Sequence, residues 1–243
     1  SYMLEVGGKR IRPVLCLMGN ELFADIHPDA WTIGAGIELF HNFTLVHDDI
    51  MDRAPLRRGK PTVHARFNES SALLAGDVMI LKAYEYFIRT DPGRVQLLIG
   101  LLNATGQQVC EGQQLDKDFE KSSTVTLPDY LHMIELKAAV FRAASLQMCS
   151  IIAGAGTADQ QHLYEFGKNL GLAFQVQDDW LDAFGDPASF GKQTGGDIMQ
   201  NKKTFLLMQA LESANAIQKK NMLQLLDESG PDKVQKMLSL FKT

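Results

Sequence analysis

Long segments of the chain mix apolar residues with polar residues that favour helices, and short loops separate these segments. Alanine, leucine, methionine, glutamine, glutamate and lysine dominate them, and all six are good helix formers. Several segments follow a proline, which is typical of a first helical turn: Pro28, Pro92, Pro128 and Pro231. The pattern predicts no convincing strand, and it predicts helices at roughly 13–24, 29–53, 69–90, 93–120, 128–154, 159–183, 202–214, 216–228 and 231–242.

Two loops stand out because both are rich in glycine, proline and basic residues and both follow a cluster of aspartates. They run from Arg53 to Arg66 and from Phe184 to Lys203. The chain contains no linker, short repeat or low-complexity segment. We therefore predict a single all-α domain over residues 1–243.

The composition excludes several function classes. Hydrophobic residues make up 45% and charged residues 22%, which is ordinary for a globular protein. A formal net charge of −5 argues against nucleic-acid binding, which usually requires a basic face. The most apolar region, from Val140 to Ala155, is broken by Arg142 and Gln147, so we expect no membrane span. The cysteines are far apart and form no CxxC pair, which predicts neither a zinc site nor a disulfide framework and favours a reducing cytoplasm.

Clusters of aspartates end two of the long predicted helices. The clusters are Asp48-Asp49-Ile50-Met51-Asp52 and Asp178-Asp179-Trp180-Leu181-Asp182. Helical positions four apart share a face, and like charges at this spacing destabilise a helix by a few tenths of a kcal/mol per pair. Negative charge at a helix C-terminus also opposes the macrodipole. One cluster could be a solvated helix end, but two favour magnesium, which takes one or two carboxylates together with phosphate oxygens.

Basic residues near both clusters favour an anionic ligand. Flexible backbone lies beside three cations in Gly7-Gly8-Lys9-Arg10-Ile11-Arg12, the run Arg57-Arg58-Gly59-Lys60 follows the first cluster, and Lys192 and Lys202 follow the second. Each of these could alone be a solvated loop charge. Guanidinium groups bind phosphate oxygens bidentately. The occurrence of basic residues beside both carboxylate clusters therefore favours a diphosphate ligand over solvated loop charges.

The ordered set of motifs resembles the polyprenyl (trans-isoprenyl) diphosphate synthase family. The motifs are GGKRIRP, HDDIMDRAPLRRGKPTVH, GQQLD, ELKAA, FQVQDDWLDAFGD and GKQTGGDIMQNKKT, and they extend from Gly7 to Thr204. A single DDxxD motif is weak, but two with these basic flanks are highly specific. The resemblance implies an all-α bundle of about ten helices around a deep central cavity, usually homodimeric. It also implies a short-chain enzyme such as farnesyl or geranylgeranyl diphosphate synthase.

The resemblance further implies roles for individual residues. The magnesium ions, about three with the allylic diphosphate bound, would be held by Asp48, Asp52 and Asp178. The aspartates that complete the catalytic motifs are Asp49, Asp179 and Asp182. The residues that would contact the allylic diphosphate are Arg57, Lys137, Lys192 and Lys202. The residues that would bind isopentenyl diphosphate are Lys9, Arg12, His41 and Arg58, and those lining the site are Gln113, Asp116 and Gln175.

The implied reaction joins an allylic diphosphate (dimethylallyl, geranyl or farnesyl) head to tail to isopentenyl diphosphate. Metal ions and fixed cations stabilise the charge on the leaving diphosphate, and the site keeps water from the allylic cation. Two features depart from the family. Ala138 stands where the family often has threonine, which removes a hydroxyl dipole from near the cation. Family members also usually extend beyond the position of Thr243, so we expect terminal segments to be missing from this sequence.

The residues before the first aspartate cluster bear on product length. Thr44 is about 40° around the helix from Asp48, whereas Phe43 is about 140° away, so geometry alone does not make Phe43 a cavity floor. In the family, a bulky aromatic five positions before the first aspartate typically blocks the growing tail. The resemblance therefore predicts a fifteen- or twenty-carbon product, with the alternatives that Phe43 is core packing and that Phe40 or the segment from Leu73 to Met79 sets the length.

Three other functions fit parts of the pattern. Terpene cyclases share metal-assisted ionisation but usually carry only one aspartate-rich motif of this type. A non-catalytic partner subunit of a prenyl synthase tends to lose aspartates or basic residues that this chain keeps. A carboxylate-bridged di-iron bundle requires paired Glu-x-x-His motifs, and the sequence contains one, Glu38-Leu39-Phe40-His41. His47 and His64 are expected to be hydrogen-bonded structural residues, with the alternative that His47 orients Asp48.

Overall fold

The computed structural model describes residues 2–122, 124–186, 194–228, 230 and 232–242. It divides into two compact units, each described here by itself. The first unit comprises Ser1–Gly106 and Phe141–Lys168, and the second comprises Gln107–Val140 and Asn169–Thr243. Helices make up nearly all of the regular structure, so the predicted all-α class is confirmed. The single domain and the central cavity stay predictions.

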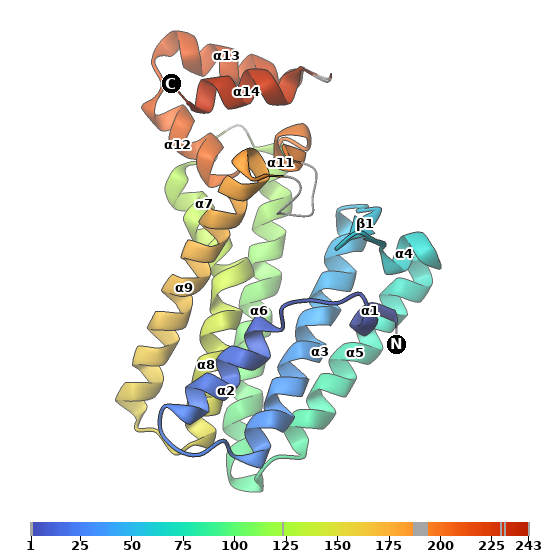
Figure 1. Cartoon of the computed structure of the whole chain (residues 1–243), viewed down its shortest axis with the longest axis vertical. Helices are drawn as coiled ribbons and strands as arrows, with labels where there is room; N and C mark the ends of the chain where they lie inside the picture. The colour runs from blue at the N-terminus through green and yellow to red at the C-terminus, as the bar shows by residue number, and fades with distance from the viewer. Residues whose placement is uncertain (1, 123, 187–193, 229, 231, 243) are drawn as a thin grey trace. The chain divides into compact units, whose positions relative to one another are not determined.

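The first unit holds the N-terminal helices and parts of three later ones. Its elements are α1 (Tyr2–Glu5), α2 (Ile11–Glu21), α3 (Pro28–Met51), β1 (Leu56–Arg57), β2 (Lys60–Pro61), α4 (Val63–Arg66), α5 (Glu69–Ile88), the start of α6 (Pro92–Lys121), most of α8 (Val140–Ile152) and the start of α9 (Thr157–Phe184). Figure 1 shows α3 and α5 running side by side, and the two helices pack along their length. A small core of Met3, Val46, Val63, Ala72 and Met79 joins them to α1 and α4.

The second unit holds the remaining parts of α6 and α9 and the C-terminal helices. Its other elements are α7 (Leu127–Ile134), the π-helix η1 (Glu135–Ala139), α11 (Gly196–Met199), α12 (Phe205–Ser213), α13 (Ala216–Asp227) and α14 (Lys233–Phe241). Figure 1 shows α13 and α14, in red, lying against each other. The core of this unit is formed by Tyr130, Met133, Ile134, Ile198, Leu207, Met208, Met222, Leu225 and Met237.

Local signals in the sequence explain where the helices begin. Pro28 and Pro92 are the first residues of α3 and α6, as predicted. The side chain of Thr126 caps α7 in a capping box with Asp129, and Asn68 Oδ1 accepts a hydrogen bond of 2.7 Å from Ser71 N at the start of α5. Each predicted helix is present, with ends that differ by a few residues. Pro231 lies outside the described residues.

A short hairpin shows that the prediction of no strands was wrong. In it, Leu56 pairs with Pro61 and Arg57 with Lys60, antiparallel. The two residues between these strands have positive φ, 52° at Arg58 and 74° at Gly59, which is the backbone of a type I′ hairpin turn. Strands of two residues carry no alternating pattern, so the arginine–glycine turn was the only available signal.

Cys16 on α2 and Cys149 on α8 form a disulfide in the first unit, with their Cα atoms 5.1 Å apart. Both residues are fully buried. The expectation of no disulfide is therefore corrected, because the fold brings together cysteines that are 133 positions apart in the chain. Such a separation leaves no spacing signal in the sequence. Cys110 is free and exposed.

We expect alkylation under denaturing, non-reducing conditions to label Cys110 alone, as read by mass spectrometry. Because the disulfide closes a long loop, reduction should lower the free energy of unfolding by about 2–4 kcal/mol. Denaturant titrations with and without reductant measure the difference, and Cys110→Ser should leave it unchanged. Labelling of all three cysteines in unreduced protein would contradict the disulfide.

No helix of the described segments is both long enough and apolar enough to cross a bilayer.

Candidate active site

The C-terminal turn of α3 carries the first aspartate cluster, and the hairpin that follows turns an arginine back onto it. Arg57 Nε donates to both carboxylate oxygens of Asp49, at 2.8 and 2.9 Å, and Arg57 Nη2 lies 3.4 Å from Asp48 Oδ2. Asp49 is 1% exposed, and burial raises its pKa although the charge of Arg57 opposes the rise. Asp49 is therefore an internal anchor for the hairpin, whereas Asp48 and Asp52 are only partly buried.

A cationic group lies farther along the first unit, centred on Arg12 of α2 and His41 of α3. Arg12 Nη1 donates to His41 Nε2 at 2.9 Å, and its guanidinium carbon lies 5.3 Å from the ring centroid of Phe141. Burial, followed by repulsion from Arg142, lowers the pKa of Arg12 to about 9, so the guanidinium is still charged at neutral pH. Burial and the charge of Arg12 hold the pKa of His41 well below its usual value, so the imidazole is neutral.

Two buried nitrogens of this group favour an anionic ligand. Arg12 Nε and His41 Nδ1 are buried, and neither has a hydrogen-bond partner among the described residues. Because Arg12 donates to the Nε2 atom of neutral His41, the Nδ1 atom carries the proton and is also a donor. A buried donor without an acceptor costs about 1–3 kcal/mol. An anionic ligand with several oxygens would satisfy both donors and the surrounding positive charge.

The glycines of the N-terminal motif allow Arg58 to reach the same region. Arg58 Nη1 donates to the carbonyl oxygen of Gly7. Gly8 has a φ of 142°, and a Cβ atom there would lie 2.5 Å from Arg58 Nη1, so a larger residue would displace the guanidinium. Burial and the nearby charge of Arg57 lower the pKa of Arg58. Lys9 lies in this loop and is exposed.

Arg142 belongs to this cationic group and has no assigned role in the sequence prediction. It is 8% exposed, and its charge contributes to the lowered pKa values of both Arg12 and His41. The available signal was its position, because it interrupts the most apolar stretch of the chain. Arg10, by contrast, is structural, since its Nη1 atom lies 2.5 Å from Glu38 Oε1.

The second aspartate cluster ends α9, in the second unit, and its middle aspartate is again buried. Asp179 is 5% exposed and accepts hydrogen bonds from the Tyr130 hydroxyl, from Phe205 N at 2.8 Å and from Gln175 Nε2 at 3.2 Å. Burial raises the pKa of Asp179, and these hydrogen bonds oppose the rise. Asp178 and Asp182 are only partly buried. In both clusters, therefore, the middle aspartate is buried and the outer aspartates lie nearer the surface.

The ELKAA motif forms the π-helix η1, which carries Lys137. Lys137 Nζ lies 2.5 Å from Asp116 Oδ2 on α6, so two residues predicted for the site are paired within the second unit. A Cβ atom at Gly112 would lie 2.3 Å from Lys137 N, which shows how closely α6 approaches the π-helix. Single-turn π-helices occur frequently at functional sites. Gln113 lies beside Gly112 on α6 and is partly buried.

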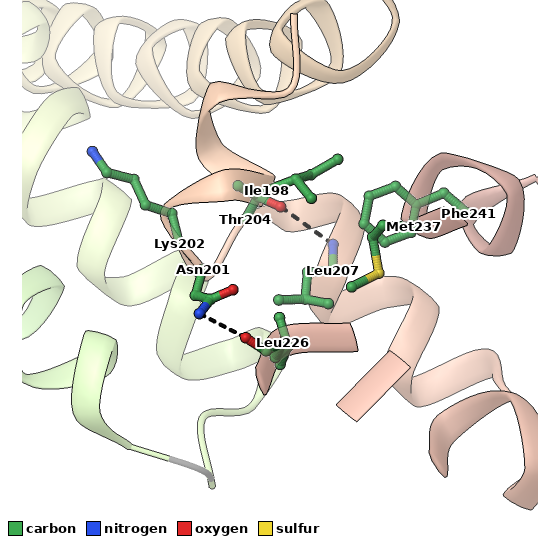
Figure 2. Close-up of a pocket in the computed structure, with 8 residues that line it drawn as sticks. All are labelled: Ile198, Asn201, Lys202, Thr204, Leu207, Leu226, Met237 and Phe241. Atoms are coloured by element: carbon green, nitrogen blue, oxygen red, sulfur yellow. Dashed lines mark hydrogen bonds between the residues drawn. The ribbon is translucent and has the colours of Figure 1, made fainter. Parts of the chain in front are cut away.

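Lys202 lies next to a very small cavity in the second unit, shown in Figure 2. The cavity has a volume of about 10 Å³, enough for a single water at most, so it does not accommodate a substrate. The Thr204 hydroxyl caps α12 at Leu207 N, and Asn201 Nδ2 donates to the carbonyl oxygen of Leu226 at 2.8 Å. Figure 2 shows the Lys202 side chain directed away from the apolar side chains of the cavity. Lys192 lies outside the described residues.

A divalent metal fits the chemistry of the outer aspartates. Among residues that the structure describes, no three side chains of histidine, cysteine, aspartate or glutamate gather into a complete metal site. The outer aspartates offer only carboxylate oxygens, in pairs four positions apart: Asp48 with Asp52, and Asp178 with Asp182. Magnesium prefers this donor set, and it binds through one or two carboxylates with substrate phosphates supplying other ligands.

Comparison with known proteins identifies the family. The family model for polyprenyl synthetase matches residues 1–243. The chain belongs to the polyprenyl synthetase family. Among its relatives, the short chain isoprenyl diphosphate synthase of Methanothermobacter thermautotrophicus is 37% identical over 243 residues, which are all of this chain and 75% of that protein. The geranylfarnesyl diphosphate synthase of Natronomonas pharaonis is 39% identical over 227 residues, covering 86% of this chain and 67% of the relative.

The fold of the chain also agrees with solved structures. A crystal structure of a geranylgeranyl pyrophosphate synthase matches with a TM-score of 0.94 and 43% identity, over 99% of this chain and 76% of that one. The family prediction made from the motifs is therefore confirmed. The homodimer, the cytoplasmic location and the roles of single residues stay predictions.

Proposed function

We propose that this protein joins an allylic diphosphate to isopentenyl diphosphate, head to tail, and releases an all-trans prenyl diphosphate. The single observation that carries the proposal is the buried pair Arg12–His41, whose two unpartnered donors lie among arginines in the same unit as an aspartate cluster. A binding site with these donors and positive charges suits a diphosphate. The relatives, named as synthases of prenyl diphosphates, support the same chemistry.

We assign the outer aspartates Asp48, Asp52 and Asp178 to magnesium, about three ions in all, and Asp182 completes the second cluster four positions after Asp178. Bound magnesium would neutralise charge on the diphosphate that leaves from the allylic substrate. Asp49 and Asp179 act as positioning residues in this scheme, because protein donors already occupy them. Arg57 then has two functions, since it fixes Asp49 and presents its remaining donors next to Asp48.

The reaction requires no nucleophilic side chain. The bond between C1 and oxygen of the allylic substrate breaks, and diphosphate leaves with the electron pair. The double bond of isopentenyl diphosphate attacks C1, and loss of a proton restores an allylic double bond, with the departing diphosphate as the base. In the first unit, Arg12, His41, Arg58 and Lys9 would hold isopentenyl diphosphate. In the second unit, Lys137 and Lys202 would contact the allylic diphosphate, with Asp116, Gln113 and Gln175 lining the site.

The release of diphosphate tests this function against its alternatives. We expect purified protein with magnesium to release diphosphate rapidly only when an allylic primer (dimethylallyl, geranyl or farnesyl diphosphate) and isopentenyl diphosphate are both present. Rapid release from the primer alone would instead indicate a terpene cyclase. No release under any of these conditions would indicate a non-catalytic subunit. Either result would contradict the proposal.

Phe43 is our candidate for the residue that limits product length to fifteen or twenty carbons. Its ring lies 5.3 Å from the ring of Phe40 and 4.9 Å from that of His47, between centroids. It also packs against the small core of the first unit. Thr44 is next to it, with its hydroxyl bonded to the carbonyl oxygen of His41 at 2.8 Å.

We expect Phe43→Ala to extend the main product by at least about one five-carbon unit, because removing the ring opens space for the tail. The first condensation should be largely unaffected. Chromatography of the dephosphorylated products measures the shift, and Phe166→Ala, which removes a ring that is 59% exposed, is the matched control. An unchanged product distribution from folded, active Phe43→Ala protein would show that another residue limits the length.

A further inference from the structure

His47 fills a space on α5 that only a glycine provides. A Cβ atom built on Gly76 would lie 2.3 Å from His47 Nε2 and 2.5 Å from His47 Cδ2. These distances are far shorter than the contact distance of two non-bonded carbons, about 3.5 Å. The imidazole therefore lies directly on the backbone of α5, and any side chain larger than hydrogen at Gly76 would displace it.

Contacts on α5 fix the orientation of this ring. His47 Nε2 donates to the carbonyl oxygen of Leu73 at 3.2 Å, and it lies 3.8 Å from Asp77 Oδ1. The sequence left open the alternative that His47 orients Asp48. The observed contacts instead connect α3 to α5, since Leu73, Gly76 and Asp77 belong to one turn of that helix.

The same imidazole supports the ring of Phe43. The two rings meet edge to face, with an interplanar angle of 76°. Phe43 in turn meets Phe40 edge to face, and Phe40 meets Phe141 of α8 at 5.2 Å between centroids. Interior side chains are close-packed, so a shift of one ring in this row is transmitted to the next. Gly76 and His47 are thus placed to determine where the Phe43 ring lies.

We propose that Gly76 is a specificity-determining position and that His47 is a positioning residue for product length, acting through the orientation of Phe43. The inference rests on the proposed function. A methyl group at Gly76 pushes the imidazole towards Phe43, reduces the space beside that ring and shortens the product. Removal of the imidazole by His47→Ala has the opposite effect, because the Phe43 ring loses its support and can turn aside.

Product analysis of Gly76→Ala and His47→Ala tests the inference, with Gly100→Ala as the matched control. Gly100 is also a helical glycine, but a Cβ atom there would meet no atom within 4 Å. The ratio of the longest product to the next shorter one should fall at least about fivefold in Gly76→Ala and rise in His47→Ala, and Gly100→Ala should match the wild type. In the double variant the methyl group has no imidazole to push, so the product should resemble that of His47→Ala.

Each outcome decides the inference. Folded Gly76→Ala protein with the wild-type product distribution would overturn it. If Gly76→Ala does not fold, His47→Ala decides, and an unchanged product from that variant would overturn the inference while leaving the proposed function intact. Absence of any prenyl diphosphate from the wild type would overturn the proposed function and this inference with it.

Discussion

Alanine in place of Asp178 should lower the turnover number about 100- to 1,000-fold and leave the melting temperature within about 2 °C of the wild type. Asp178 is an outer, partly buried aspartate of the second cluster, assigned to magnesium. Its removal should reduce stabilisation of the leaving diphosphate without breaking the core. Steady-state kinetics and thermal unfolding, on the same preparation, measure the two effects.

The neighbouring Asp179→Ala variant is the matched comparison. It removes the acceptor for the Tyr130 hydroxyl and for Phe205 N, both inside the second unit. Each buried donor left without an acceptor costs about 1–3 kcal/mol, so this variant should melt several degrees lower. Asp179→Asn keeps one acceptor oxygen, so its melting temperature should lie between those of the wild type and Asp179→Ala. Equal losses of stability in Asp178→Ala and Asp179→Ala would contradict the division between outer and buried aspartates.

Arg12→Ala should raise the KM for isopentenyl diphosphate about 10- to 100-fold, with a smaller effect on the KM for the allylic primer. Arg12 has a buried Nε donor with no hydrogen-bond partner among the described residues, and its donation to His41 Nε2 leaves a second such donor at His41 Nδ1. Arg12→Lys should recover little of the affinity, because an ammonium group cannot reproduce the guanidinium fork.

The control for this measurement is Arg89→Ala. Arg89 has a side chain that is 63% exposed, and its recorded contacts are a long ion pair with Glu85, at 3.7 Å, and a cation–π contact with Tyr86 on the same helix turn. This variant should keep the wild-type KM for both substrates. An Arg12→Ala enzyme with an unchanged KM for isopentenyl diphosphate, or with equal increases for both substrates, would show that the cationic group binds something else.

Helices and aspartate clusters were predictable from the sequence because their signals are local. A proline at a first turn and a run of helix formers define α3 without reference to the rest of the chain. The same holds for the position of Asp48 and Asp178 at helix ends.

Other features depend on contacts between distant segments and were not predictable. Nothing in the sequence distinguishes Asp179 from Asp178, because the donors from Tyr130 and Phe205 come from other helices. The disulfide of Cys16 with Cys149 is non-local in the same way. In the sequence, Arg142 was recognisable only as an interruption of an apolar stretch. Its role in the cationic group follows from the fold, in which its charge helps to lower the pKa values of Arg12 and His41.

The most direct test of the central claim is condensation by the purified chain. Radiolabelled isopentenyl diphosphate and geranyl diphosphate are incubated with the protein in magnesium, and the products are dephosphorylated and separated by chain length. The proposal predicts a labelled fifteen- or twenty-carbon prenyl alcohol, lost in excess chelator and restored by added magnesium. The absence of labelled product in magnesium, or full product formation in chelator, would contradict it.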